Sequence, residues 1–232
     1  FGYIPVGCAA GIDHSMREAC GSENAAFLDG EMLRVDFKGE EVELVGESEL
    51  LIKGEHNVSN ALAAAAAALA CGVDAAQVRE GLVSFKPLEH RLEPCGEIGG
   101  VKFVNDSKAT NVDATLKALS AFAPHTAIFL LGGNDKGTDL DELVEACDAK
   151  CKAVVCFGAA GERFFDAFAN AGVKHVRAEH MEDALDTAIS MAQSGDEVVL
   201  SPACSSFDEF DSFEHRGKVF KQLVAFRASN AR

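Results

Sequence analysis

Residues 101–111 read VKFVNDSKATN, and this stretch indicates both the fold and the place of a ligand site. Its first four residues, Val101–Val104, form a short apolar run of the kind found in a buried strand. The run ends in a carboxylate, an ammonium and several hydroxyl and amide groups. A strand that ends in such a cluster is typical of a ligand site in a parallel sheet.

Outward from this stretch, the chain alternates short apolar runs with amphipathic patterns. Strands are expected at Val101–Val104, Ala127–Leu131, Ala153–Phe157, Val173–Val176 and Val198–Leu200. Helices are expected near 112–122, 139–150, 161–171, 181–193 and 213–227. This alternation predicts an α/β domain whose doubly wound, mostly parallel, Rossmann-like sheet is covered by helices on both faces.

The N-terminal part of the chain has a different pattern. Residues 27–52 carry short alternating apolar positions, which predict a β-meander with a turn at Gly39. Two helices are expected after it. Asn57 could cap the first helix and Gly72 could end it, whereas Asp74 could cap the second.

A domain boundary is expected where the second of these helices ends. Pro87 disfavours the helical conformation at Lys86, so we place the boundary between residues 87 and 94. The sequence therefore predicts two unequal pieces, residues 1–90 and residues 91–232.

The composition is that of a globular protein with a strong acidic excess. Lys and Arg number 21 against 37 Asp and Glu, which gives a formal net charge of −16. This charge argues against a nucleic-acid partner, because such binding needs Lys and Arg to neutralise phosphates. The longest uncharged apolar run, residues 61–71, is shorter than the ~20 residues that span a bilayer, so no membrane partner is expected.

The cysteines indicate the cellular compartment of the chain, and its first residue indicates whether it is part of a longer protein. Eight cysteines without a C-x-x-C pair indicate the reduced thiols of a cytoplasmic protein, and only Cys204 stands in a polar loop. The histidines show no ligand spacing, so no metal site is predicted. Because the chain begins with Phe and has no signal-peptide pattern, we expect it to be an excised part of a longer protein.

Candidate ligand residues gather in loops and at the expected domain junction. Three polar loops directly follow predicted strands, at residues 105–111, 132–138 and 201–213. Ligands of doubly wound sheets bind outside the carboxyl ends of the strands, so these loops should share one rim. His90 and Arg91 fall at the junction, where ligand sites are common and where an exposed hinge with ordinary ion pairs is the alternative.

The first loop offers the widest choice of polar groups. Asp106 could accept hydrogen bonds from sugar hydroxyls, and Lys108 could meet a phosphate. Thr110 or Asn111 could orient a carboxylate or simply cap the next helix. An ordinary turn remains the alternative for the whole loop.

The other two loops offer backbone groups as well as side chains. Residues 132–137, GGNDKG, would allow a ligand to approach main-chain N–H groups, or would form a tight turn with a solvated Lys136. In the third loop, Ser206 and the backbone around Phe207 could bind a carboxylate. Gly217, inside a helical pattern, indicates close packing against another backbone.

Five segments together resemble the ATP-dependent Mur ligases in order and spacing across nearly the whole chain. They are residues 54–62 (GEHNVSNAL), 89–91 (EHR), 105–111 (NDSKATN), 131–136 (LGGNDK) and 201–217. The form DSKATN resembles in particular the member of peptidoglycan precursor synthesis that adds D-glutamate. That activity would use ATP and Mg²⁺ to activate UDP-N-acetylmuramoyl-L-alanine as an acyl phosphate, which the amine of D-glutamate then attacks.

The resemblance implies a role for several residues. The nucleotide would be bound by Asn60, His90, Arg91 and Asp106, and the reacting phosphates would be met by Lys108 and Arg91 as the catalytic residues. The carboxylates of D-glutamate would be bound by Thr110, Lys136, Ser206, Phe207 and Phe213. Phe207 stands where the family has Leu, a change that a main-chain contact tolerates.

The resemblance also implies an organisation. Residues 1–90 would be the C-terminal part of a central ATP-binding domain, and residues 91–232 would be the domain that binds the amino acid. The 232 residues contain no phosphate loop of the form G-x-x-x-x-G-K-[ST]. We therefore expect that loop and the magnesium ligands upstream of Phe1, no activity in the isolated chain, and a monomeric full-length enzyme.

Two alternatives stay open. One is a sibling Mur ligase or a ligase like folylpolyglutamate synthase, which would add a different amino acid or act on a different acceptor. The other is a non-catalytic Rossmann-type module that binds a dinucleotide. The lack of G-x-G-x-x-G after Val104 argues against the second alternative.

Overall fold

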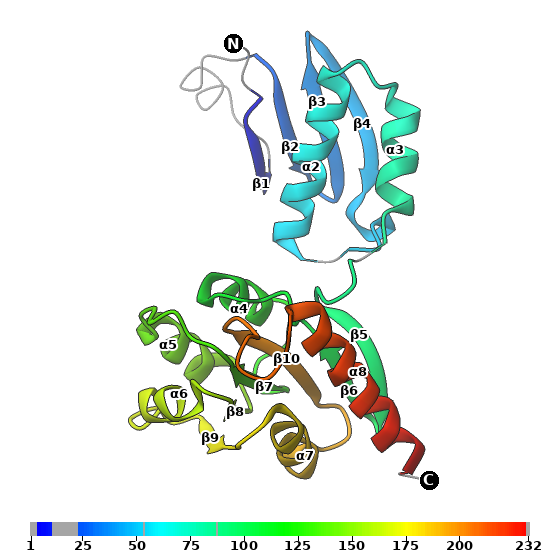
Figure 1. Cartoon of the computed structure of the whole chain (residues 1–232). Coiled ribbons are helices and arrows are strands. Elements are labelled where there is room, and N and C mark those ends of the chain that lie inside the picture. Colours follow the sequence, from blue (N-terminus) through cyan, green and yellow to red (C-terminus); the bar gives the residue numbers. More distant parts are fainter. Residues whose placement is uncertain (1–3, 11–22, 53, 87, 231–232) are drawn as a thin grey trace. The chain divides into compact units, whose positions relative to one another are not determined.

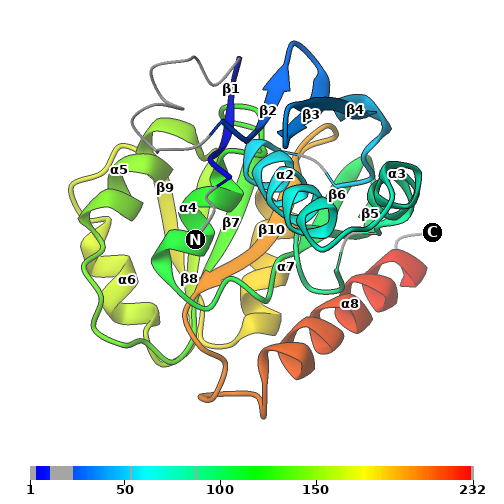
Figure 2. The ribbon, with the colours of Figure 1, turned by 90° about the horizontal axis from the view of Figure 1, so that it is seen from above.

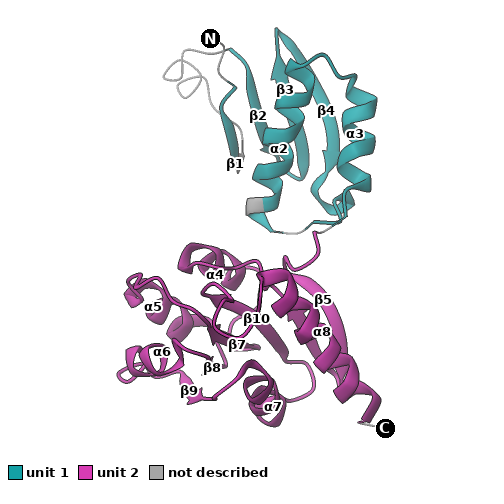
Figure 3. Cartoon of the chain, viewed as in Figure 1, with its two compact units in different colours: residues 1–87 teal, residues 88–232 magenta. Residues whose placement is uncertain are grey.

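The computed structural model describes residues 4–10, 23–52, 54–86 and 88–230. It divides into two compact units, unit 1 (Phe1–Pro87) and unit 2 (Leu88–Arg232), which Figure 3 shows in different colours. Within the described ranges, no helix combines the length and the apolar character needed to cross a bilayer.

Unit 1 contains a four-stranded sheet with the order β1-β2-β3-β4. Its strands are β1 (Val6–Ala10), β2 (Ala25–Asp29), β3 (Met32–Phe37) and β4 (Glu40–Gly46). β2, β3 and β4 are antiparallel neighbours, which confirms the meander, and β1 adds a parallel strand that was not predicted. Lys38 and Gly39 form the turn with φ of 55° and 80°. The strand pattern stops at Gly46, where the short 3₁₀ helix η1 (Glu47–Glu49) follows.

Two helices follow this sheet, α2 (Glu55–Ala70) and α3 (Ala75–Ser84), and Figure 1 shows both. The predicted cap at Asn57 is wrong, because α2 already begins at Glu55 after Gly54, whose φ of 95° suits glycine. The predicted stop at Gly72 is confirmed by its φ of 88°. The cap of α3 is also confirmed, since the Asp74 side chain accepts a hydrogen bond from the Ala76 N–H at 2.8 Å. Pro87 lies outside the described residues.

Unit 2 is built on a six-stranded sheet with the order β5-β6-β10-β7-β8-β9. Its strands are β5 (Glu93–Ile98), β6 (Val101–Asn105), β7 (Ala127–Gly132), β8 (Ala153–Phe157), β9 (Lys174–Arg177) and β10 (Glu197–Ala203). Every pair is parallel except β5 with β6. The doubly wound, mostly parallel sheet predicted from the sequence is confirmed, and the antiparallel edge strand β5 is an addition to it.

Helices cover both faces of the sheet of unit 2, as Figure 2 helps to follow. They are α4 (Val112–Leu119), α5 (Asp141–Lys150), α6 (Gly161–Ala167), α7 (Met181–Met191) and α8 (Phe213–Asn230). Successive strand residues point to opposite faces, so Phe129 belongs to the same core as Phe164 of α6, and Ile128 belongs to the same core as Phe220 of α8. α4, α5 and α6 thus share one core and α7 and α8 the other.

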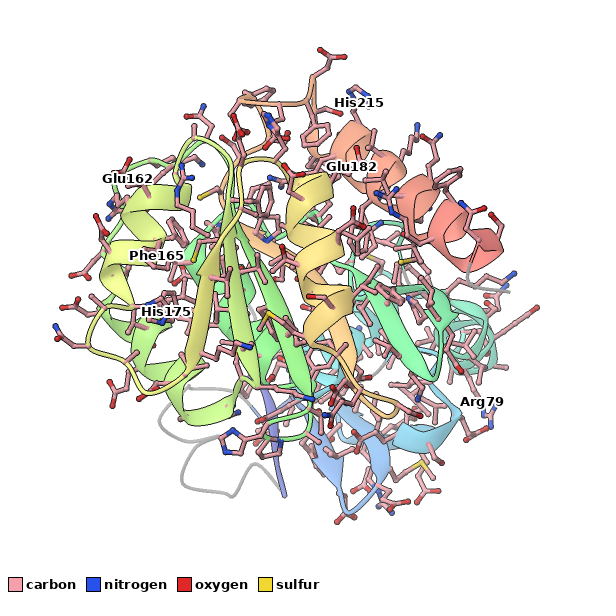
Figure 4. The ribbon with its side chains drawn as sticks, turned by 90° about the horizontal axis from the view of Figure 1, so that it is seen from below. Arg79, Glu162, Phe165, His175, Glu182 and His215 are labelled. Carbon is pink, nitrogen blue, oxygen red and sulfur yellow. The ribbon has the colours of Figure 1, made fainter. Side chains whose placement is uncertain are left out.

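The outermost parallel strand, β9, is fixed to α6 by aromatic side chains. Figure 4 labels Phe165 of α6 and His175 of β9, whose ring centroids lie 4.9 Å apart. The ring centroid of Phe168, the residue that follows α6, lies 6.0 Å from that of His175. These ring contacts hold a partly buried edge strand, and among the residues that the structure describes its histidine has no ion-pair partner.

Candidate ligand site at the carboxyl rim of unit 2

The carboxyl ends of three neighbouring strands bring the three polar loops together. β10 lies between β6 and β7 and is parallel to both, so the loops at residues 105–111, 132–138 and 201–213 leave the same edge of the sheet. We call these loops the carboxyl rim. Asn134 and Ser205 join two of them, with the Asn134 N–H donating to the Ser205 carbonyl and the Ser205 hydroxyl donating to the Asn134 carbonyl, both at 2.9 Å. The common rim expected from the sequence is confirmed.

The two glycines that end β7 are needed for packing within the protein. A Cβ atom on Gly132 would overlap the carbonyl of Phe157 in β8, and one on Gly133 would overlap the carbonyl of Ser205. Both glycines also have positive φ, 140° and 128°. The close approach predicted for a ligand is therefore made here by neighbouring backbone.

A buried arginine that the sequence analysis missed holds the rim together. Arg216 of α8 is fully buried, and its guanidinium donates to the carbonyls of Ser107, Cys204 and Ser205 at 2.9 to 3.2 Å. Its Nε donates to the Ser107 hydroxyl at 2.9 Å, and that hydroxyl donates to the Phe213 carbonyl at 2.8 Å. Burial lowers the pKa of Arg216 to about 10, which leaves it charged at neutral pH.

Asp106 also belongs to the buried part of the rim. Its carboxylate accepts from the Ser201 hydroxyl at 2.7 Å and from the Leu92 N–H at 3.2 Å. Burial raises the pKa of Asp106 to about 6, against the opposing effects of these hydrogen bonds and of the Arg91 charge. A carboxyl group poised near neutrality can change its charge when a cation or a ligand arrives.

The two lysines predicted to bind ligands lie on the outside of the rim. Lys108 and Lys136 are both exposed, and neither forms an ion pair in the described parts of the chain. The ammonium of Lys108 lies 4.0 Å from the centroid of the Phe213 ring, a cation–π contact. Thr110 is partly buried beside it, whereas Asn111 caps α4 by accepting from the Ala114 N–H at 2.9 Å.

The loop after β10 supplies the last predicted contacts. Ser206 is buried, while the neighbouring Phe207 is 69% exposed. Asp208 fixes this loop by accepting from the Ala159 N–H at 3.1 Å. The rim thus presents Ser206 and Phe207 on a loop that is tied down on both sides.

The start of unit 2 places His90 and Arg91 beside a charged cluster. Arg91 is exposed and His90 is buried. Ligand atoms of Glu89, His90 and Glu93 lie within 4.8 Å of one another, a grouping that the sequence analysis did not foresee. The ammonium of Lys221 already lies 2.7 Å from Glu89 Oε1 and 2.9 Å from Glu93 Oε1. A cation of the protein itself therefore bridges these two carboxylates.

Asn60 belongs to unit 1, apart from the other predicted site residues. It is exposed on α2 and lines a groove of about 410 Å³ between α2 and α3. The other walls of the groove are mostly apolar and include Ala65, Leu82 and Phe85. Such a groove suits a flat apolar group with one polar contact.

The cysteines do not add to the site. Burial raises the pKa of Cys204 to about 12, so its thiol stays protonated at neutral pH although it stands in a polar loop. A hydrogen bond with Cys151, together with burial, raises the pKa of Cys147. Cys71 is exposed, and Cys20 lies outside the described residues.

Comparisons with known proteins agree with this geometry. A model described as "Mur ligase, glutamate ligase domain" matches residues 90–204. Among similar curated proteins, UDP-N-acetylmuramoylalanine–D-glutamate ligase of Koribacter versatilis is 45% identical over 189 residues, which are 82% of this chain and 41% of that protein. The same-named ligase of Salinibacter ruber is 42% identical over 209 residues, 90% of this chain and 45% of that protein. The chain thus spans less than half the length of these relatives.

Solved structures share the fold at lower identity. A pseudomurein peptide ligase type C from Methanothermus fervidus has a TM-score of 0.64 at 18% identity, covering 89% of this chain and 42% of that one. Folylpolyglutamate synthase of Mycobacterium tuberculosis complexed with ADP has a TM-score of 0.62 at 18% identity, covering 90% and 51%. A MurF ligase from Thermotoga maritima in complex with ADP has a TM-score of 0.60 at 16% identity, covering 98% and 55%.

Proposed function

We propose, from the premise that this chain belongs to the Mur ligase family through its C-terminal domain, that it is part of an ATP-dependent ligase. The reaction would add D-glutamate to UDP-N-acetylmuramoyl-L-alanine in peptidoglycan precursor synthesis. Unit 2 would bind the amino acid, and unit 1 would be part of the central ATP-binding domain. The observation that carries this proposal is the carboxyl rim, which combines exposed cations with a rigid buried support.

The rim suits a small dicarboxylate. Lys108 and Lys136 come from the loops after β6 and β7, and Thr110, Ser206 and the backbone of Phe207 add hydrogen-bonding groups. A unit charge pair at about 4 Å is worth roughly 4 kcal/mol at an effective dielectric near 20. Two such cations can therefore bind an anion in spite of the formal net charge of −16. Phe213 would add a main-chain contact.

The nucleotide would be met by other groups. Arg91 would neutralise phosphate charge as one of two catalytic residues, and Asp106 would accept from the ribose. Asn60 would approach the adenine, and His90 would lie next to Arg91. The Glu89–His90–Glu93 cluster does not fit Mg²⁺, because the Lys221 ammonium occupies the position of a cation there. We therefore assign no Mg²⁺ ligand to unit 2.

In this reaction the residues of the chain would position the reactants and neutralise charge. The carboxylate of the substrate attacks the γ-phosphorus of ATP, and ADP leaves. The amine of D-glutamate then attacks the acyl phosphate, and inorganic phosphate leaves with the formation of the amide. Lys108 would stabilise the transferred phosphoryl group, and Thr110 and Lys136 would aim the amine through the carboxylates of D-glutamate. The 232 residues lack a phosphate loop, so we expect no turnover from them alone.

Specificity for D-glutamate is favoured over the alternatives. The similar D-glutamate ligases reach 38–47% identity with this chain, whereas folylpolyglutamate synthase shares the fold at 18%. A dinucleotide-binding module would need a glycine-rich fingerprint after β6, where this chain has NDSKATN. As the family resemblance implies, we expect a cytoplasmic, monomeric full-length enzyme.

Calorimetric titration of this chain with D-glutamate tests the proposal. We expect D-glutamate to bind more tightly than L-glutamate or D-alanine, and Lys136→Met to weaken D-glutamate binding at least tenfold. Lys150→Met is the matched control, because Lys150 is exposed at the end of α5 and outside the rim. Equal losses in the two variants, or preference for another amino acid, would contradict D-glutamate binding at the rim. Phosphate release from ATP by the isolated chain with both substrates would contradict its expected inactivity.

A further inference from the structure

The buried imidazole of His90 takes part in a hydrogen-bond chain that the proposed function leaves unexplained. His90 is 3% exposed and has a φ of 66°. Its Nδ1 lies 2.9 Å from Nδ2 of Asn105. Its Nε2 is buried and has no hydrogen-bond partner in the described ranges of the chain. A buried polar atom without a partner costs roughly 1–3 kcal/mol and is a feature that calls for a reason.

The orientation of the Asn105 amide follows from contacts that do not involve His90. Asn105 Nδ2 lies 2.9 Å from Glu93 Oε2, and Asn105 Oδ1 accepts from the Ser107 N–H at 3.2 Å. Burial acts to raise the pKa of Glu93, but hydrogen bonds from Lys221, the His90 N–H and Asn105 outweigh it and lower that pKa. Glu93 is therefore ionised and can only accept, so the atom facing it must be the amide nitrogen.

This orientation decides which imidazole nitrogen carries hydrogen. The second hydrogen of the Asn105 amide nitrogen points to Nδ1 of His90, so Nδ1 must accept. In the neutral ring the hydrogen then lies on Nε2. We propose that Asn105 is a positioning residue that fixes this tautomer of His90 and keeps its Nε2–H as an unused donor for an oxygen of the bound nucleotide. Only the identity of that acceptor rests on the proposed function.

The packing around the pair supports a built arrangement. A Cβ atom on Gly217 would overlap His90 Nδ1 and would lie 3.0 Å from Asn105 Oδ1, so only glycine leaves room for the two side chains. The sequence predicted that Gly217 packs against another backbone, whereas it packs against these side chains. Phe213 closes the other side, with its ring edge-to-face on His90 at 6.1 Å.

Three carboxylates and one ammonium lie around His90. Glu89 Oε1 lies 3.7 Å from Nε2 and Glu93 Oε2 lies 3.9 Å from Nδ1. Lys221 bridges both carboxylates, and Glu214 lies near enough to interact with His90 through its charge. A ring whose Nε2 carries hydrogen cannot bind a metal through that nitrogen, which agrees with the position of Lys221. The cluster therefore holds the Nε2–H donor of His90 in place and is not a cation site.

Long-range ¹H–¹⁵N correlation spectra of the histidine rings test the tautomer directly. They are recorded on the ¹⁵N-labelled chain without nucleotide, and the His90 signals are identified by their loss in His90→Gln. We expect the neutral His90 ring to show a protonated Nε2 and an unprotonated Nδ1. A spectrum with hydrogen on Nδ1 would overturn the proposal without any further variant.

Two substitutions at Asn105 then test its role. Asn105→Asp replaces the donor by an acceptor, so the hydrogen should move to Nδ1, and Asn105→Ala should give a mixture of both tautomers. His175 serves as the internal control, because its ring packs between Phe165 and Phe168 in another part of unit 2. A folded variant with the wild-type tautomer would overturn the positioning role. Should neither variant fold, Gly217→Ala, which pushes on the same pair, replaces them, and the wild-type spectrum still decides the tautomer.

Addition of ADP separates this inference from the proposed function. We expect ADP to shift the Nε2–H signal of His90 and to leave that of His175 unchanged. If ADP binds without this shift, or does not bind at all, a nucleotide oxygen is not the acceptor. The tautomer and the role of Asn105 would then stand on the nucleotide-free spectra alone.

Discussion

Two parts of the carboxyl rim differ in almost every physical respect although they alternate in the sequence. The buried frame consists of Asp106, Ser107, Ser201 and Arg216, all hydrogen-bonded inside unit 2. The exposed face consists of Lys108, Lys136 and Phe207. Ser107 and Lys108 are neighbours, yet one is fully buried and the other reaches solvent. Some polar residues of a loop can thus stabilise its conformation, while their neighbours bind a ligand.

The difference follows from the cost of burying polar groups. A buried donor or acceptor must find a partner in the protein, which explains why the guanidinium of Arg216 is bonded to several backbone carbonyls. A cation meant for a ligand should keep its charge unpaired and accessible, as Lys136 does. Substitutions in the buried frame should therefore change stability, and substitutions in the exposed face should change binding.

The largest effect is expected from Arg216→Met. It leaves the carbonyls of Ser107, Cys204 and Ser205 without a donor in the interior, and we expect a loss of about 3–5 kcal/mol of unfolding free energy. Arg163→Met is the control, because the exposed Arg163 pairs with Asp135 and donates to the Thr138 carbonyl without being buried itself, and its loss should cost no more than about 1 kcal/mol. Urea unfolding followed by circular dichroism measures both. Similar losses would remove the distinction between frame and face.

The next effect concerns the pH dependence of stability. The pKa of Asp106 is raised to about 6 in the folded state from 3.8, so the folded state holds its proton more tightly than the unfolded state. The contribution of Asp106 to stability is then highest below the unfolded pKa and falls as the pH rises from about 4 to about 6, by roughly 3 kcal/mol in total. Asp106→Asn should remove this fall, because the amide has no charge to bury.

Urea unfolding between pH 4 and pH 7 tests this expectation. The Ser201 hydroxyl can turn to accept from the new amide while it donates to Thr115, 3.2 Å away, so the substitution should be accommodated. Wild type and Asp106→Asn should be close in stability near pH 4 and differ most near pH 7, where the variant is more stable. Parallel pH profiles for the two proteins would show that Asp106 does not titrate in this range.

A smaller effect is expected where Lys108 of the exposed face contacts Phe213, the first residue of α8. The Phe213 ring lies 4.0 Å from the Lys108 ammonium, and such a cation–π contact is worth about 0.5–1 kcal/mol at an exposed site. A double-mutant cycle with Phe213→Leu and Lys108→Met should return a coupling energy of that size. The same cycle with Phe213→Leu and Lys136→Met is the control and should return none. Equal coupling in both cycles would refute the contact.

The smallest effect is expected in the chemical reactivity of Cys204. Its buried thiol, with a pKa raised to about 12, should resist alkylation in the native protein, whereas the exposed Cys71 should react at once. Peptide mass mapping after brief exposure to iodoacetamide measures both. In folded Arg216→Met the rate at Cys204 should rise, because Arg216 fixes the carbonyl of Cys204. Prompt alkylation of Cys204 in the wild type would show that the frame opens readily.

The apolar periodicity of the sequence sufficed for most of the fold. The fully buried β7 reads AIFLLG, and a run of this kind is recognised without any structure. β5 was missed because it reads EPCGEI, a polar segment with Pro94 and Gly96 that gains its strand conformation only from β6. The cap at Asn57 was misplaced because Gly54, which has no side chain to donate or accept, takes the N-cap position and the helix begins at Glu55.

The candidate site divides in the same way. The rim could be predicted because strand ends and polar loops are visible in the sequence. Arg216 could not be recognised, since a charged residue in a helix is ordinarily exposed. A signal was nevertheless present, because Phe213, Arg216, Gly217 and Phe220 follow the three- and four-residue spacing of a buried stripe. The pairing of Asn105 with His90 depends on left-handed backbone at His90, which no pattern of residue types reveals.

The position of β10 has a consequence for how unit 2 is made. The strand between β6 and β7 is the last one in the chain, so about 90 residues separate it from β6 in the sequence. During synthesis, the edges of β6 and β7 that pair with β10 stay unpaired until residues 197–203 have left the ribosome. Unit 2 therefore completes its sheet late, and a nascent chain halted before β10 would present open edges that invite pairing with other chains.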